Sequence, residues 1–161
     1  MSRRVEIDVV GSKTVMDMGR MTMVHPLDID TQEKVQFANV RGGPKRLLVF
    51  LTAADCYACL AQIGDWIGLT KHYSRDKFEV DMLFLATAPN ELQSFRSSYN
   101  LPYRVLLDQN NEISRFINIP PKTPVSILVD GDFRVLAAQG AEKDEPARQA
   151  FVAKLGSLIK E

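Results

Sequence analysis

Short runs of apolar residues alternate along the chain with segments in which apolar residues recur every three or four positions. The runs cover residues 46–52, 78–86 and 125–129. The first run is too short for a helix and is rich in strand-forming residues, which predicts a strand buried on both faces of a sheet. We expect strands at the other two runs as well. Helical spacing predicts helices at 60–73, 90–99 and 146–160.

Shorter elements complete this alternation. Residues 104–107 predict a short strand, 112–116 a brief helix, and 133–138 a strand that pairs with 125–129 across a tight turn. Alternating strands and helices predict an α/β fold, with a central sheet between helices and a final hairpin that adds an antiparallel edge.

The N-terminal segment has a weaker pattern. Residues 13–27 alternate loosely and predict short strands or a hairpin, 28–33 form a polar turn, and 34–40 predict another short strand. We therefore expect residues 1–34 to form a β-rich N-terminal extension packed on the same domain as residues 35–161.

Composition narrows the class of protein. The chain has 161 residues, 45% hydrophobic and 25% charged, which is typical of one globular domain. Twenty basic residues balance twenty acidic ones, so the positive surface of a dedicated nucleic-acid binder is missing. No apolar run is long enough for a membrane span.

The first residues contain two arginines but no apolar segment of the kind that a signal peptide needs. The sequence as written therefore predicts a cytoplasmic protein, or an extracytoplasmic one if a leader was omitted. We expect a monomer.

The two cysteines, Cys56 and Cys59, are separated by two residues and follow the strand at 46–52. We expect them on the first turn of the next helix, where unpaired N–H groups and the helix dipole lower a cysteine pKa. Cys56 would attack a disulfide and Cys59 would resolve the mixed disulfide. The alternative is two reduced thiols packed as small hydrophobes. Two cysteines without nearby histidines cannot complete a zinc site.

Two segments carry a family resemblance. KRLLVFLTAADCYAC and, far downstream, KTPVSILVDGDFRVL resemble the thioredoxin superfamily, in particular its TlpA-like and redoxin branch. The similarity spans about residues 35–161. It implies a thioredoxin-like fold, with Cys56 and Cys59 as active-site cysteines. It also implies that Pro124 is a cis-proline, with Thr123 before it, so that the Thr123 backbone can pair with a substrate strand.

The segment around the cysteines departs from the family pattern. Asp55 replaces the usual tryptophan, and Tyr57-Ala58 between the cysteines lacks the common proline. We expect these three residues to tune the site. An acidic neighbour disfavours a thiolate while a helix terminus favours it, which leaves the reduction potential open. Asp55 could instead be only a helix cap.

Other positions separate the chain from two better-known branches. Phe50 stands where thioredoxins proper have a buried acid, which argues against a thioredoxin itself. Val49 and Ala53 stand where peroxiredoxins have a proline and a hydroxyl residue, so we expect no peroxidase.

A methionine-rich stretch supports a different class of function. Met16, Met18, Met21 and Met23 precede His25. Thioether and imidazole ligands suit Cu(I), whereas methionine is also a common gap-filler in apolar cores. A copper-handling or binding module with the cysteine pair is therefore the alternative function, although we assign no metal ligand.

The sequence hypothesis is thus a thiol–disulfide oxidoreductase that works through Cys56 and Cys59 without a cofactor. Its expected partners are a protein disulfide or dithiol substrate and a redox partner that regenerates the pair. A redox-inactive scaffold with reduced cysteines is a third interpretation. The direction of electron flow stays open.

Overall fold

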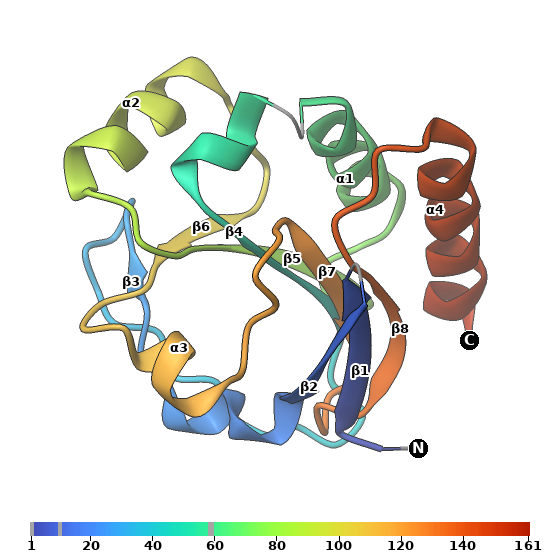
Figure 1. Cartoon of the computed structure of the whole chain (residues 1–161). Helices are drawn as coiled ribbons and strands as arrows, with labels where there is room; N and C mark the ends of the chain where they lie inside the picture. The colour runs from blue at the N-terminus through green and yellow to red at the C-terminus, as the bar shows by residue number, and fades with distance from the viewer. Residues whose placement is uncertain (1, 10, 58–59) are drawn as a thin grey trace.

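A six-stranded mixed sheet forms the centre of the molecule, with a two-stranded hairpin beside it (Figure 1). The computed structural model describes residues 2–9, 11–57 and 60–161. The sheet has the order β3-β6-β5-β4-β7-β8, and its strands are β3 (Leu27–Asp28), β4 (Lys45–Leu51), β5 (Phe78–Phe84), β6 (Arg104–Leu107), β7 (Val125–Val129) and β8 (Val135–Gln139). The hairpin consists of β1 (Arg4–Val9) and β2 (Ser12–Asp17).

Strands β4, β5 and β6 run parallel, whereas β3, β7 and β8 are antiparallel to their neighbours. The helices are η1 (Met18–Met23) and η2 (Ala53–Tyr57), both 3-10 helices, followed by α1 (Leu60–His72), α2 (Pro89–Ser98), α3 (Glu112–Phe116) and α4 (Glu145–Lys160). The predicted α/β fold, a mixed sheet between helices with an N-terminal β element, is therefore confirmed.

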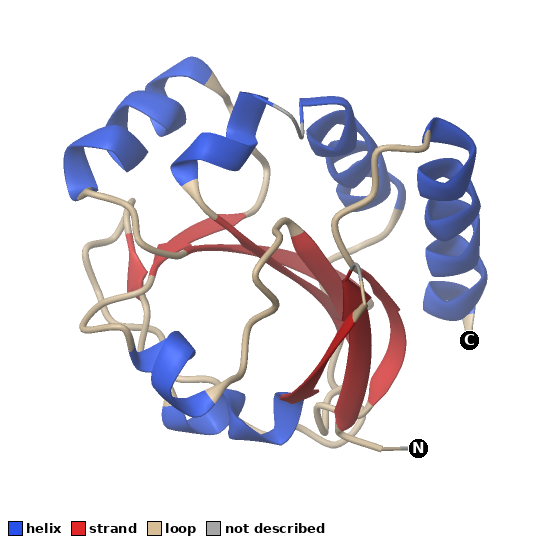
Figure 2. Cartoon of the chain, viewed as in Figure 1, coloured by secondary structure: helices blue, strands red, loops and turns tan. Residues whose placement is uncertain are grey.

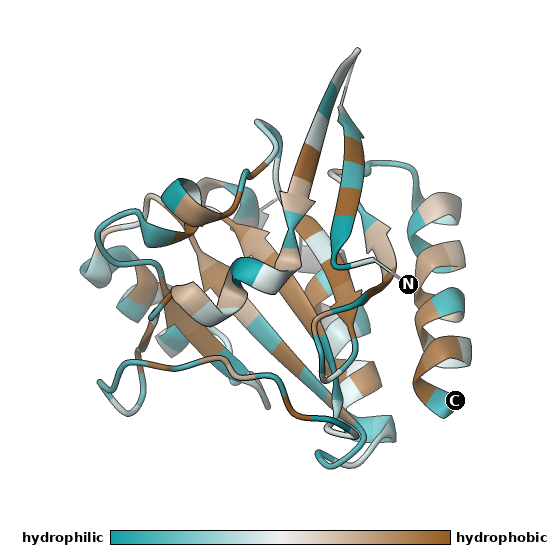
Figure 3. Ribbon diagram, turned by 90° about the horizontal axis from the view of Figure 1, so that it is seen from below, coloured by the Kyte–Doolittle hydropathy of each residue, from teal (hydrophilic) through white to brown (hydrophobic). Residues whose placement is uncertain are grey.

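The sheet separates two apolar cores. Helices α1, α2 and α4 lie on one side of it, whereas α3, η1 and the hairpin lie on the other (Figure 2). Residues 47–51 of β4 are all buried, because their side chains alternate between the two cores. In Figure 3 the strands of the sheet are accordingly mostly hydrophobic, while polar residues interrupt the helices and loops around them.

The hairpin also contacts the outer strand of the sheet. Strand β1 packs against β8, and the Val135 N–H donates to the Ser2 carbonyl at 2.8 Å. At the other edge, β3 contributes only two residues.

The strand that we expected at residues 34–40 was wrong. The segment pairs with no strand in the described parts of the chain apart from one bridge at Lys34. Its Phe37 is buried and contacts the Phe133 ring edge-on. The Val40 N–H donates to the Gly131 carbonyl, and a side chain at Gly131 would collide with the Val40 carbonyl. The segment is therefore held by one buried aromatic and a turn instead of by a ladder of strand hydrogen bonds.

Three other boundaries differ. Met18–Met23 is a 3-10 helix instead of part of a strand. Helix α2 covers Pro89–Ser98, one residue earlier at each end than the predicted helix at 90–99, and Ala88 is its N-cap residue. Phe133 precedes β8 with a φ of 60°, a conformation that excludes it from the strand.

Among the described residues, no helix is long and apolar enough to cross a membrane.

Candidate functional site

The cysteine segment follows β4 at the carboxyl edge of the parallel strands. Strand β4 ends at Leu51, and η2 then covers residues 53–57, including the backbone of Cys56 and Tyr57. Helix α1 starts only at Leu60. Cys56 therefore belongs to a separate 3-10 helix before α1, not to the first turn of α1 as the sequence predicts. Ala58 and Cys59 lie outside the described residues.

The Asp55 side chain connects η2 by hydrogen bonds to a segment far away in the sequence. Its Oδ2 accepts hydrogen bonds from the Thr52 N–H at 2.9 Å, from the Thr52 hydroxyl at 3.1 Å and from the Thr123 hydroxyl. The carboxylate thus bonds to the end of β4 and to the residue two positions before β7. These contacts differ from a simple cap, in which the side chain accepts from N–H groups of the helix that follows.

The Thr123–Pro124 segment lies directly across from this turn. Its peptide bond is cis, and β7 begins immediately afterwards. Val125 is the antiparallel partner of Phe50 near the end of β4. Both Thr123 and Pro124 are half-buried. The sheet register and the Asp55 contact together bring Thr123 beside the helix that contains the Cys56 backbone.

A third threonine, Thr87, supports the start of η2. The Ala53 N–H donates to the Thr87 hydroxyl at 3.2 Å, and that hydroxyl donates to the Leu85 carbonyl at 2.7 Å. The sequence analysis did not identify Thr52 or Thr87. Their shared signal is position, because both follow the carboxyl ends of parallel strands, where α/β sheets place their binding loops.

The side chain of Asp108 lies at the same edge of the sheet as Asp55. Asp108 directly follows β6, and its Oδ1 accepts a hydrogen bond from the Ile113 N–H at 3.1 Å. Burial raises the pKa of the Asp108 carboxyl above its ordinary value of 3.8, and the nearby Glu112 acts in the same direction. The Ile113 hydrogen bond opposes this effect.

Most of the methionines that suggested a copper site are packed in an apolar core. Met16, Met18 and Met21 are fully buried in the apolar core beside the hairpin, while Met23 is 47% exposed. His25 Nδ1 lies 3.5 Å from the Glu112 carboxylate. Within the described ranges, no three His, Cys, Asp or Glu side chains are grouped as metal ligands would be.

Comparisons with known proteins agree with this fold. The sequence pattern of the AhpC/TSA family matches residues 21–155. No curated protein sequence matches the chain.

Several solved structures are similar to it. One is described as a thiol:disulfide interchange protein, DsbE, from Chlorobium tepidum, with a TM-score of 0.72, 17% identity, and coverage of 89% of this chain and 99% of that one. A thioredoxin-like protein from Porphyromonas gingivalis has a TM-score of 0.69, 18% identity and coverage of 89% and 94%. A secreted disulfide oxidoreductase from Mycobacterium tuberculosis has a TM-score of 0.67, 16% identity and coverage of 86% and 97%.

Proposed function

Because the chain belongs to the AhpC/TSA family, in the redoxin branch of the thioredoxin superfamily, we propose that it exchanges disulfides with protein substrates through Cys56 and Cys59. Membership in a family of thioredoxin-like oxidoreductases supports a redox activity in general. The cysteine pair, the substrate class and the roles of neighbouring residues are the finer parts of this proposal.

The observation that carries the proposal is the hydrogen bond from the Thr123 hydroxyl to Asp55. It joins the residue before Cys56 to the residue before the cis-proline. An extended substrate segment that pairs with the Thr123 backbone would therefore lie next to the segment that holds the attacking cysteine. This arrangement favours protein or peptide substrates over small disulfides.

The reaction transfers two electrons and needs no cofactor. The Cys56 thiolate attacks one sulfur of the substrate disulfide, which forms a mixed disulfide and releases the first substrate thiolate. The Cys59 thiolate then attacks the Cys56 sulfur, closes the Cys56–Cys59 disulfide and releases the second thiolate. The substrate is reduced and the pair oxidised, and a dithiol partner reverses the change in the protein.

A peroxidase is the second candidate, because the same family name covers peroxidases that reduce peroxide with a cysteine. Val49 on β4 and Ala53 at the start of η2 occupy the positions where the peroxidase pattern has a proline and a hydroxyl residue. Neither valine nor alanine supplies those groups. Both residues favour disulfide exchange over peroxide reduction.

The copper alternative has less support than the redox function. Three of its four methionines have no exposed surface, which favours a packing role.

Reduction of insulin disulfides in the presence of dithiothreitol tests the proposal. We expect activity in the wild type, loss of activity in Cys56→Ser, and an accumulated mixed disulfide in Cys59→Ser, because the resolving thiol is then missing. Full activity of Cys56→Ser would contradict the proposal. Rapid consumption of hydrogen peroxide without insulin reduction would instead favour the peroxidase.

A further inference from the structure

Two side chains bind backbone N–H groups at the start of η2, the helix that contains the Cys56 backbone. The first N–H groups of a helix have no carbonyl partner within it. The Thr52 N–H donates to the Asp55 carboxylate at 2.9 Å. The next N–H, that of Ala53, donates to the Thr87 hydroxyl at 3.2 Å. The start of η2 is therefore held by a carboxylate of its own turn and by a hydroxyl from a different part of the sheet.

These side chains hold η2 from opposite sides, because β4 lies between β5 and β7 in the sheet. The Asp55 carboxylate also accepts a hydrogen bond from the Thr123 hydroxyl, in the segment before β7. Thr87 follows β5 and precedes α2, which lies beside η2 (Figure 1). The turn after β4 is thus held on its β7 side by Thr123, through Asp55, and on its β5 side by Thr87.

The backbone after β5 turns the Thr87 hydroxyl towards η2. The Leu85 N–H still donates to the Leu51 carbonyl at the end of β4, at 2.7 Å. Ala86 then has a φ of 46°, in the left-handed region, so the chain changes direction there. After this turn, the Thr87 hydroxyl donates back to the Leu85 carbonyl at 2.7 Å. Because its hydrogen is used in that bond, the hydroxyl meets the Ala53 N–H as an acceptor, through an oxygen lone pair.

The Thr87 hydroxyl makes two hydrogen bonds that a hydrocarbon side chain cannot make. Valine has nearly the shape of threonine but carries neither a donor nor an acceptor, whereas serine keeps the hydroxyl. In Thr87→Val, the Ala53 N–H and the Leu85 carbonyl would both lose this partner. We therefore expect the start of η2 to open more often in this variant.

We propose that Thr87 is a positioning residue of the disulfide exchange, which holds η2, and with it Cys56, from the side opposite to Thr123. This inference rests on the proposed function, because it assigns Thr87 a role in the reaction of Cys56. Thr123 fixes the segment against which a protein substrate pairs, whereas Thr87 fixes the segment that carries the attacking cysteine. Loss of the Thr87 hydroxyl should therefore slow the reaction with every disulfide, and it should lower kcat more than it changes KM.

Reduction of two different disulfides tests this division of roles. Insulin is a protein substrate, whereas hydroxyethyl disulfide has no peptide backbone that could pair with Thr123. Thr87→Val should lower kcat about tenfold for both, with KM within about twofold of the wild type, and Thr87→Ser should restore most of the loss. Thr123→Val should slow mainly insulin reduction. A loss in Thr87→Val that is confined to insulin or to KM, or that Thr87→Ser does not restore, would overturn the proposal.

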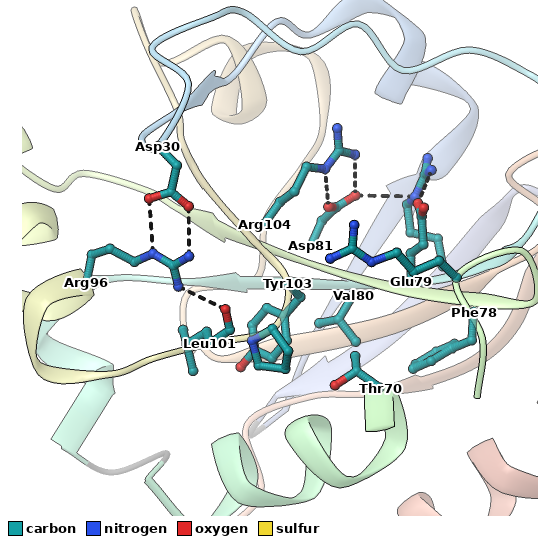
Figure 4. Close-up of a pocket in the computed structure, with 13 residues that line it drawn as sticks. Asp30, Thr70, Phe78, Glu79, Val80, Asp81, Arg96, Leu101, Tyr103 and Arg104 are labelled. Atoms are coloured by element: carbon teal, nitrogen blue, oxygen red, sulfur yellow. Dashed lines mark hydrogen bonds and ion pairs between the residues drawn. The ribbon is translucent and has the colours of Figure 1, made fainter. Parts of the chain in front are cut away.

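Thr70 on α1 provides a matched control. It is half-buried like Thr87, and its hydroxyl donates to the Ile67 carbonyl at 2.8 Å and to the Trp66 carbonyl at 3.2 Å, both within its own helix. Figure 4 shows Thr70 near Val80, towards the end of β5 that is opposite to Thr87. Thr70→Val should therefore keep the wild-type kcat for both disulfides. Equal losses in Thr70→Val and Thr87→Val would refute a specific role of Thr87.

Hydrogen exchange of the Ala53 amide in ¹⁵N-labelled protein tests the contact without any redox reaction. Exchange should be about tenfold faster in Thr87→Val than in the wild type, because the bond that protects this amide is lost. It should be unchanged in Thr70→Val. Inactivity of the wild type towards both disulfides would contradict the proposed function. A wild-type exchange rate of Ala53 in an active Thr87→Val variant would contradict only the role of Thr87.

Discussion

Asp55 replaces an aromatic residue of the family pattern with a carboxylate whose Oδ2 accepts three hydrogen bonds, from Thr52 and Thr123. Hydrogen bonds to an ionised acceptor are about twice as strong as neutral ones. Asp55 therefore links the residue after β4 to the segment before β7 through charged hydrogen bonds. In the proposed enzyme, Asp55 is a positioning residue because it acts through Thr123.

A double-mutant cycle measures the interaction between Asp55 and Thr123. Asp55→Ala and Thr123→Val should each destabilise the fold, with a coupling free energy of about 1–3 kcal/mol in urea unfolding. Thr123→Val should also lower kcat/KM for insulin reduction about tenfold, because the loop against which substrate pairs is no longer fixed.

Thr22 provides the control for this cycle. Its hydroxyl donates to the Gly19 carbonyl within η1. Thr22→Val should therefore show no coupling with Asp55→Ala beyond about 0.5 kcal/mol. A coupling between Asp55 and Thr123 as small as this would contradict their assigned roles.

The contact itself could not be predicted from the sequence. Asp55 and Thr123 are separated by 68 positions, and only the pairing of β4 with β7 brings them together. The family resemblance predicted that the two segments lie close together, as the hydrogen bond shows, but a carboxylate beside a cysteine has no local signal for a partner so far away.

At the scale of elements, the strength of the apolar pattern decided which predictions succeeded. Strands β4, β5 and β7 are largely buried on both faces, and their mainly apolar runs predicted them within two residues. The methionine stretch was ambiguous because its spacing changes. Met16 and Met18 fit a strand, whereas Met18 and Met21 are three apart, the repeat of a 3-10 helix. The chain follows the first spacing in β2 and the second in η1.

Two substitutions in η1 test this interpretation. Met21 is fully buried and Met23 is 47% exposed, although both belong to the same short helix. Met21→Ala should lower the free energy of unfolding by about 2–5 kcal/mol, and Met23→Ala by less than about 0.5 kcal/mol. Guanidinium chloride unfolding of both variants provides the measurement. Equal effects would show that η1 does not pack as described.

At the scale of the whole molecule, two partly buried carboxyls on opposite sides of the sheet make folding less favourable as pH rises. Asp65 on α1 and Asp108 after β6 both have a pKa raised mainly by burial. Each is harder to ionise in the folded chain than in the unfolded chain. Each carboxyl therefore stabilises the folded chain relative to the unfolded chain, and this contribution is complete below the ordinary pKa of 3.8. The contribution is lost as pH rises through the pKa that the carboxyl has in the folded chain.

Asp108→Asn should accordingly gain stability relative to the wild type as pH rises from about 3 to 7. The neutral amide can still accept the Ile113 N–H, but it carries no charge to bury. Asp76 is the opposite case, because a hydrogen bond from Ser74 lowers the pKa of its carboxyl. Asp76→Asn should lose relative stability over the same range. Urea unfolding across this range checks both signs, and parallel curves for Asp108→Asn and the wild type would contradict the first.

The contact of the N-terminal hairpin with β8 also affects how the protein behaves in concentrated solution. A long unpaired edge strand is a template for another copy of the chain. Here one edge of the sheet is the two-residue β3, and at the other edge β1 packs against β8 and the Val135 N–H donates to the Ser2 carbonyl. Over the described part of the chain, the hairpin therefore occupies space beside β8 that a strand of a second molecule would need, and the β3 edge is too short for extended pairing.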